Sequence, residues 1–264
     1  MRSLIGLVLC LLFASSAARA DDLDDVLARG ELRWGGDQEG GGPYVYPSDD
    51  DPDVIVGFEV DRPLADAVAA YLGVRARFVQ ADWDAMPDML GAGKIDVMLN
   101  GYEWTPVRAD ALEPSMPYYV YGLQLLARSE DDSIAAFEDL DRANTDGTKR
   151  RLGALVGSAA EDWLRERFGA TCEVIAYDGN TDAMREVETG KLDATLQDTP
   201  IASFYAPSFP GLRPIGAPVG RGYYVMFVRD GESRLVPRLN EALIVLQRRG
   251  DLGRIYRRYG LWDA

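Results

Sequence analysis

Short apolar runs and amphipathic segments alternate along nearly the whole chain. The short runs are typical of strands and cover residues 31–34, 54–60, 74–79, 95–99, 121–127, 152–156, 172–176, 193–196 and 223–228. Helical spacing of apolar residues predicts a helix that is capped by Asp61, has Pro63 in its first turn and ends at Gly73, and further helices over 83–90, 161–168, 181–189 and 235–259. Gly250 interrupts the last of these helices. The alternation predicts an α/β protein.

Two similar apolar segments, 121–127 and 223–228, bracket a separate series of strands and helices. A chain that leaves one sheet, builds a second sheet and then returns forms two lobes joined by two crossovers. We therefore predict a first lobe over residues 21–122 and 220–264, and a second lobe over 123–219. Ligands of open α/β sheets bind at strand ends and in clefts between domains, so the cleft between the lobes is the expected site.

The first twenty residues are typical of a secretory signal peptide. Arg2 precedes an apolar run over 4–13, and the segment ends in Ala18-Arg19-Ala20. The apolar run is too short to span a bilayer, which takes about 20 apolar residues. We expect cleavage after Ala20 and a mature chain that is periplasmic or otherwise extracytoplasmic. That chain keeps a single cysteine, Cys172, which excludes an internal disulfide and is expected to be a buried apolar residue.

Composition excludes several kinds of chemistry. The chain has no histidine, so it has no Ser/His/Asp triad, no His/Cys zinc site and no imidazole acid or base. Its net charge of −15 argues against nucleic acid as a partner. Loss of the leader removes two arginines and no acidic residue, so the mature chain is more acidic still. We expect no metal and no cofactor.

A set of short motifs carries a resemblance to a known family. Asn-Gly-Tyr-Glu-Trp-Thr-Pro-Val-Arg at 100–108 follows the apolar run 95–99, with Gly-Phe-Glu-Val-Asp at 57–61 before it and Pro-Tyr-Tyr at 117–119 after it. The second lobe adds Val-Gly-Ser-Ala-Ala-Glu at 156–161, Gly-Lys-Leu-Asp-Ala at 190–194, and Gln197-Asp198. In this order the motifs resemble the periplasmic binding proteins of polar amino-acid ABC importers, solute-binding family 3.

The resemblance implies a type II periplasmic binding fold, in which each lobe is a mixed sheet flanked by helices and two hinge strands join the lobes. It also implies a monomeric, non-enzymatic protein that captures an amino acid between its lobes and delivers it to the membrane permease subunits of an ABC importer. One alternative is a periplasmic cyclohexadienyl (prephenate/arogenate) dehydratase-like enzyme on the same fold, with Glu103 or Glu161 as acid or base. Another is a sensor module that presents its closed form to a receptor.

Arg108 is the candidate for binding the ligand's α-carboxylate, because a guanidinium donates two parallel hydrogen bonds and keeps its charge. The alternative is a solvated arginine paired with Asp110 or Glu113. Gly101 leaves the backbone open to close approach of the ligand. Glu103 departs from the family, which usually has Ser or Thr there. It either accepts from the ligand's ammonium group or holds Arg108 in place, and these two roles stay open.

The second lobe contributes a helix start and an aspartate. The free N–H groups at Ser158 and Ala159 favour an anionic group, although an ordinary capped helix explains the same residues. Ala159 replaces the second hydroxyl of the family, so only its N–H can contribute. Asp198 is the candidate partner for the ligand's α-ammonium group, with a plain helix N-cap before Thr199-Pro200 as the alternative.

The side-chain pocket is expected to include Asp37, Trp83 and Tyr44, which match pocket positions of the resemblance. For the two aromatic residues, a place in the core is equally compatible with the pattern. Gly-Gly-Gly at 40–42 replaces the family's usual stacking aromatic residue. Asp37 and Glu103 together would suit a cationic ligand such as arginine, lysine or ornithine.

Overall fold

The computed structural model describes residues 22–38, 41–48, 50–57, 64–231 and 234–261. These residues form two five-stranded sheets and a small two-stranded one. The first large sheet has the strand order β4 (Arg75–Gln80), β1 (Glu31–Gly36), β5 (Val97–Met98), β12 (Phe227–Arg229) and β6 (Leu112–Pro114). The second has the order β11 (Leu212–Tyr224), β7 (Tyr119–Arg128), β10 (Ala194–Asp198), β8 (Arg151–Leu155) and β9 (Glu173–Tyr177). The small sheet pairs β2 (Tyr46–Pro47) with β3 (Ile55–Val56).

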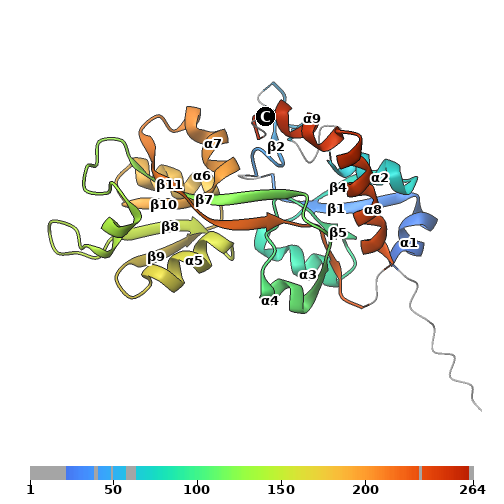
Figure 1. The fold of residues 1–264 in the computed structure, drawn as a ribbon, viewed down its shortest axis with the longest axis horizontal. Helices are drawn as coiled ribbons and strands as arrows, with labels where there is room; N and C mark the ends of the chain where they lie inside the picture. The colour runs from blue at the N-terminus through green and yellow to red at the C-terminus, as the bar shows by residue number, and fades with distance from the viewer. Residues whose placement is uncertain (1–21, 39–40, 49, 58–63, 232–233, 262–264) are drawn as a thin grey trace, which may run out of the picture.

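Both large sheets are mixed, and helices flank each of them (Figure 1). In the first sheet β1 is parallel to β4 and β5, whereas β12 is antiparallel to β5 and β6. In the second sheet β8 is parallel to β9 and β10, whereas β7 is antiparallel to β10 and β11. We call each sheet with its helices the first lobe and the second lobe. The helices of the first lobe are α1 (Asp22–Arg29), α2 (Leu64–Leu72), α3 (Met86–Gly91), α4 (Pro106–Ala111), α8 (Leu235–Arg248) and α9 (Asp251–Arg258), and those of the second are α5 (Ala159–Phe168), α6 (Asn180–Glu188) and α7 (Thr199–Tyr205).

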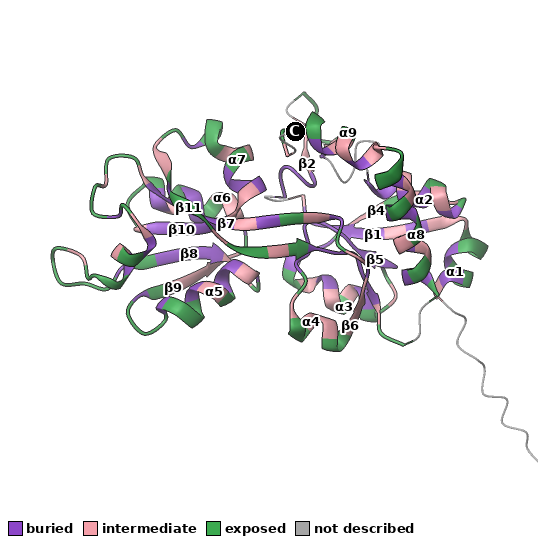
Figure 2. Ribbon diagram, in the orientation of Figure 1, coloured by how far each residue is buried: buried purple, intermediate pink, exposed green. Residues whose placement is uncertain are grey.

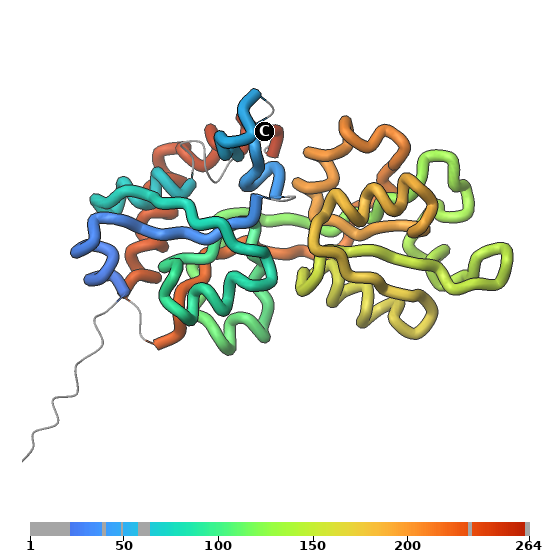
Figure 3. Tube along the Cα trace, turned by 180° about the vertical axis from the view of Figure 1, so that it is seen from behind, coloured from blue at the N-terminus to red at the C-terminus, as the bar shows by residue number. Residues whose placement is uncertain are grey.

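Two long strands connect the lobes. β7 and β11 run side by side from one lobe to the other, as the views from both sides show (Figures 1 and 3). Their antiparallel register is interrupted between Ile215 and Gly222, where β11 bulges. The pair therefore forms the two crossovers that the sequence pattern predicts, while the residue boundaries of the lobes stay a prediction.

The core of each lobe lies where helices cover a sheet, and Figure 2 shows buried residues concentrated along the strands. Helix α8 illustrates the cause, because its buried residues recur at helical spacing and form one apolar face; they are Leu235, Val236, Leu239, Ala242, Leu243 and Leu246. Gly250 separates α8 from α9 with a φ of 71°, which confirms the predicted break. Cys172 is buried, and this burial raises the pKa of its thiol.

Several element predictions need correction. Residues 223–228 do not form one strand, because β11 ends at Tyr224 and β12 begins at Phe227. At this point the chain changes sheets, and the N–H of Met226 donates to Ser115 Oγ at 2.9 Å. The run 95–99 pairs as a strand only at Val97 and Met98. Residues 58–63, with the predicted cap Asp61 and the end of the strand predicted over 54–60, lie outside the described residues, as do residues 1–21 with the predicted leader.

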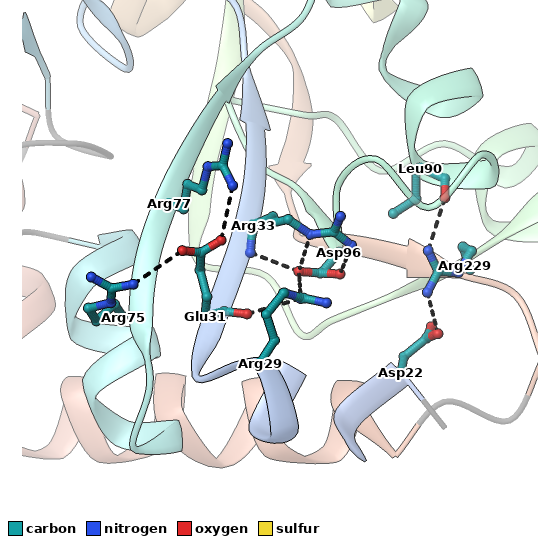
Figure 4. Close-up of polar contacts among 9 residues, drawn as sticks. All are labelled: Asp22, Arg29, Glu31, Arg33, Arg75, Arg77, Leu90, Asp96 and Arg229. Carbon is teal, nitrogen blue, oxygen red and sulfur yellow. Dashed lines mark hydrogen bonds and ion pairs between the residues drawn. The ribbon is translucent and has the colours of Figure 1, made fainter. Parts of the chain in front are cut away.

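A charged cluster holds the start of β5 in place (Figure 4). The Asp96 carboxylate is buried and accepts hydrogen bonds from Arg29 at 2.5 Å and from the guanidinium and N–H of Arg33, both at 2.8 Å. Nearby, Arg229 of β12 donates to Asp22 of α1 and to the Leu90 carbonyl oxygen of α3. These contacts fix the strand whose end delivers the loop of the candidate site.

Candidate functional site

The loop after β5 has a backbone that requires glycine. Asn100 and Gly101 both have positive φ, 104° and 65°. A Cβ on Gly101 would lie 3.0 Å from the Tyr44 ring, and the Gly101 N–H donates to the Tyr118 hydroxyl at 3.1 Å. The absence of a side chain at 101 therefore lets Tyr44 pack directly on the loop.

Helix α4, which the sequence pattern does not predict, positions Arg108. Thr105 caps this helix and accepts from the Arg108 N–H at 3.2 Å. The guanidinium lies over the rings of Trp83 and Tyr102, with its carbon 4.9 Å and 4.5 Å from their centroids. Its Nη1 donates to the Glu103 backbone oxygen and to Glu103 Oε2, both at 2.7 Å. The Arg108 side chain is only 14% exposed, which does not fit a solvated arginine paired with Asp110 or Glu113.

Two hydrogen bonds connect Arg108 and Glu103 to the second lobe. Arg108 Nη2 donates to the Gly157 carbonyl oxygen at 2.7 Å, and the Ala159 N–H donates to Glu103 Oε1 at 3.1 Å. The Glu103 side chain is 3% exposed. Burial acts to lower the pKa of Arg108, but the adjacent Glu103 carboxylate outweighs it, so the pKa is raised.

The contacts at the start of α5 are those of an ordinary capped helix. Ser158 is the N-cap, accepts from the Glu161 N–H at 3.2 Å and donates to the Leu155 carbonyl oxygen at 2.7 Å. The Glu161 carboxylate accepts from the Gly157 N–H at 2.6 Å and pairs with Arg165. The Ala159 N–H and the Gly157 carbonyl oxygen are the groups here that bond to the first lobe.

Asp198 lies at the end of β10 and does not act as a side-chain cap of α7. Its carboxylate accepts from the Tyr224 hydroxyl, and the Tyr44 hydroxyl lies 2.5 Å from that of Tyr224. Burial raises the pKa of Asp198 well above its usual range, and the nearby Glu103 carboxylate raises it further. A cation beside Asp198 would relieve both effects.

The remaining predicted residues lie around the same place. Asp37 follows β1 and accepts from Gln80 Nε2 at 3.1 Å, and Trp83 stacks on Tyr102 with centroids 4.5 Å apart. Within the glycine run, Gly42 faces α7 of the second lobe. A Cβ there would lie 2.4 Å from the Phe204 ring, so an aromatic residue of the second lobe occupies this space.

These elements surround a partly open cavity of about 30 Å³, with room for about two water molecules. Its lining includes most of the predicted residues, namely Asp37, Tyr44, Trp83, Gly101, Glu103, Ser158 and Asp198. Arg108 and Ala159 do not line it, whereas Glu103, which contacts both of them, does. The lining also includes three polar residues missed by sequence reasoning, Asn100, Asn180 and Gln197. Asn100 Oδ1 is buried and has no hydrogen-bond partner among the described residues.

A wider cleft of about 620 Å³ continues from this cavity and shares Asp37 and Trp83 with it. The cleft is lined by aspartates from both lobes, which are Asp37, Asp82, Asp84, Asp178 and Asp182. None of the described residues that line either space is basic. The arrangement therefore attracts cations and repels anions.

Three further observations concern the described residues. In the described part of the chain, no group of three or more Asp, Glu or Cys side chains is arranged to hold a metal ion. Glu161, one of two acid/base candidates, is not part of the described lining. Nor does any described helix have the length and apolar character needed to cross a membrane.

Comparisons with known proteins find relatives that cover most of this chain. The L-cystine-binding protein TcyJ of Escherichia coli is 28% identical over 95% of this chain and 92% of its own length. The ABC transporter arginine-binding protein 1 of E. coli is 23% identical over 76% and 80%. An ancestral arginine-binding protein bound to arginine superimposes with a TM-score of 0.77 at 30% identity, covering 88% of this chain and 98% of its own. The ancestral amino acid-binding protein AncCDT-1, a precursor of cyclohexadienyl dehydratase, does so with a TM-score of 0.80 at 27% identity over 90% and 98%.

The structural similarity confirms the predicted type II periplasmic binding fold, with two lobes built on mixed sheets. The family model of the bacterial extracellular solute-binding proteins, family 3, matches residues 33–261, from β1 to the residues after α9. The chain therefore belongs to the bacterial extracellular solute-binding proteins of family 3.

Proposed function

We propose that this protein captures an amino acid between its two lobes, outside the cytoplasm, and presents it to the permease subunits of an ABC importer. The observation that carries the proposal is the cavity lined by residues of both lobes, where Asp198 has a raised pKa and faces no basic residue among the described lining. A ligand ammonium group supplies the missing positive charge. The names of similar proteins, which bind cystine and arginine, support an amino acid as the ligand.

The two ends of the amino acid have separate partners in this proposal. The α-ammonium group binds Asp198, which comes from the second lobe, with Asn100 Oδ1 as a further acceptor from the first. The α-carboxylate binds Arg108 of the first lobe and the Ala159 N–H of the second. Because both lobes contribute, the ligand stabilises the closed arrangement by its higher affinity for it. Binding of this kind is non-enzymatic, and we propose no reaction.

The wider acidic cleft supports a ligand with a cationic side chain. It shares Asp37 and Trp83 with the smaller cavity, and its aspartates come from both lobes. A guanidinium or ammonium group at the end of a flexible side chain would reach this cleft while the backbone groups of the ligand occupy the cavity. Arginine, lysine and ornithine have this shape and charge.

The location follows from the same proposal. A protein that delivers a solute to a membrane importer acts as a monomer on the outer side of the membrane, and residues 1–20 serve as its cleaved leader. Mass spectrometry of the exported protein is expected to find Asp21 at the N-terminus. An intact leader on the exported protein would contradict this part of the proposal.

Calorimetry of the mature protein with each common amino acid tests the proposed ligand. We expect binding of L-arginine or L-lysine, loss of that binding in Asp198→Ala, and no loss in Asp162→Asn, which removes an exposed carboxylate of α5. The double variant Asp178→Asn/Asp182→Asn should weaken the binding of cationic amino acids more than the binding of L-glutamine. Binding of acidic amino acids alone would contradict the cationic preference, and no binding of any α-amino acid would contradict the proposal as a whole. Prephenate in the same series tests the dehydratase alternative, because its binding does not require an ammonium partner.

A further inference from the structure

The Glu103 carboxylate makes the contacts that a ligand's α-carboxylate is expected to make. Its Oε2 accepts from Arg108 of the first lobe, and its Oε1 accepts from the Ala159 N–H of the second. One carboxylate therefore bridges the two lobes through two charge-assisted hydrogen bonds. Glu103 lines the cavity, whereas Arg108 and Ala159 do not.

Arg108 has few donors left for a second carboxylate. Of the five N–H groups of a guanidinium, one is directed at the Glu103 backbone oxygen, one at Glu103 Oε2 and one at the Gly157 carbonyl oxygen. A bidentate contact with a ligand needs two adjacent N–H groups that face the cavity. Glu103 lines the cavity and Arg108 does not, so a ligand carboxylate in the cavity meets the Glu103 side chain before it reaches Arg108.

We propose that Glu103 is an internal competitor for the ligand's α-carboxylate, and that it holds the two lobes together when no ligand is bound. This inference rests on the proposed function and adds a competition step to it. Because Glu103 is attached to the chain, its carboxylate is present at a high effective concentration next to Arg108. The apparent affinity for an amino acid is therefore lower than the affinity of the site with Glu103 displaced.

The competition also selects for positively charged ligands. Once displaced from Arg108, the Glu103 carboxylate has lost its cation in a cavity that Asp37 and Asp198 also line, and like charges repel. A ligand with two cationic groups offsets this repulsion better than a zwitterion with one. Glu103 thus disfavours neutral amino acids, in addition to the attraction of the acidic cleft for cations.

A comparison of L-arginine with agmatine tests the proposal, because agmatine is arginine without its carboxylate. Calorimetry would measure both ligands with the wild type, Glu103→Thr and Glu103→Gln. The matched control is Asp110→Asn, which removes an exposed carboxylate from the helix that carries Arg108. We expect Glu103→Thr to raise the affinity for L-arginine by about tenfold or more and to leave the affinity for agmatine nearly unchanged. Only L-arginine has a carboxylate that can accept the hydrogen bonds freed from Glu103. Equal changes for both ligands, or weaker L-arginine binding, would contradict internal competition.

Small-angle X-ray scattering of the ligand-free proteins tests the bridge between the lobes independently of any ligand. The wild type and Asp110→Asn should have the compact radius of gyration of the closed form, and Glu103→Thr a larger one. Glu103→Gln keeps the size of the side chain, so it remains informative if circular dichroism shows that the threonine variant is not folded. An open wild type would contradict the bridge. Failure of every variant to bind L-arginine would instead contradict the proposed ligand, while the scattering result would still decide the role of Glu103.

Discussion

The Tyr224 hydroxyl, at the end of β11, donates a hydrogen bond to the Asp198 carboxylate, at the end of β10. Both strands are neighbours of β7, so the two residues meet where the crossing strands enter the second sheet. Tyr224 also forms an isolated backbone bridge with Glu103 and stacks on Tyr121 at 4.4 Å. A single residue of a crossing strand thus contacts Asp198 through its hydroxyl and Glu103 through its backbone.

Replacement of Tyr224 by phenylalanine is expected to weaken ligand binding. The hydroxyl stabilises the ionised form of Asp198, so its loss raises the pKa of that carboxyl further and leaves less carboxylate for the ammonium group. A hydrogen bond to a charged group contributes about 1.5–3 kcal/mol, which corresponds to an affinity loss of about tenfold or more. Calorimetry at neutral pH would measure this loss of affinity. Tyr44→Phe is the comparison, because it removes a hydroxyl that contacts the Tyr224 hydroxyl and leaves the bond between Tyr224 and Asp198 in place. An equal loss of affinity in both variants would contradict a direct role for Tyr224.

The raised pKa of Asp198 predicts a dependence of stability on pH. A carboxyl whose pKa is higher in the folded than in the unfolded state favours folding fully below the unfolded value of about 3.9, and this contribution is lost as pH rises through the folded pKa. The free energy of unfolding of the ligand-free wild type, measured by urea titration, should therefore fall from mildly acidic to neutral pH relative to Asp198→Asn. Parallel curves for the two proteins would contradict the raised pKa.

Ligand binding should reverse this protonation. A ligand ammonium group favours the ionised form of Asp198, so binding releases a proton in the pH range where Asp198 is protonated in the free protein. Calorimetry in buffers of different ionisation enthalpy would detect the proton as a buffer-dependent heat. The heat should not depend on the buffer for any ligand that binds without contacting Asp198.

The architecture could be predicted because it depends on local patterns. Apolar runs at 121–127 and 152–156 form β7 and β8, since a strand buried in a sheet needs no partner information to be recognised. Gly250 interrupts the last helical segment because its φ is positive, and this too is a local requirement. Short helices such as α4 were missed because six residues carry too little periodicity.

The site could be predicted only in part, because its contacts connect distant segments. The positions of Arg108 and Asp198 came from motifs, but the partner of each depends on how the lobes meet. Whether Glu103 faces a ligand or Arg108 could not be read from its spacing, and in the structure it pairs with Arg108 and with α5. Tyr224 was missed because the pattern merged the end of β11 with β12.

Gly101→Ala is expected to destabilise the protein and disturb the cavity. Its φ of 65° is unfavourable for any residue with a Cβ, and that Cβ would lie 3.0 Å from the Tyr44 ring. Urea titration should show that the free energy of unfolding falls by more than about 1 kcal/mol. Gly91→Ala is the matched control, because a Cβ at residue 91 would have no neighbour within 4 Å and no positive φ is required there, so it should be neutral or slightly stabilising. A similar loss in both variants would show that the loop conformation is not the cause.

Arg108→Met should be among the most destabilising single changes at the site. It leaves the Glu103 carboxylate, 3% exposed, with no cation beside it, and removal of one partner of a buried ion pair costs about 3–5 kcal/mol. The double variant Arg108→Met/Glu103→Leu should recover most of this loss, since a pair of apolar residues leaves no buried charge. Urea titration of both variants and of Glu103→Leu completes a double-mutant cycle. Additive losses would contradict the pairing, whereas a recovered double variant that no longer binds L-arginine would separate the role of Arg108 in binding from its role in stability.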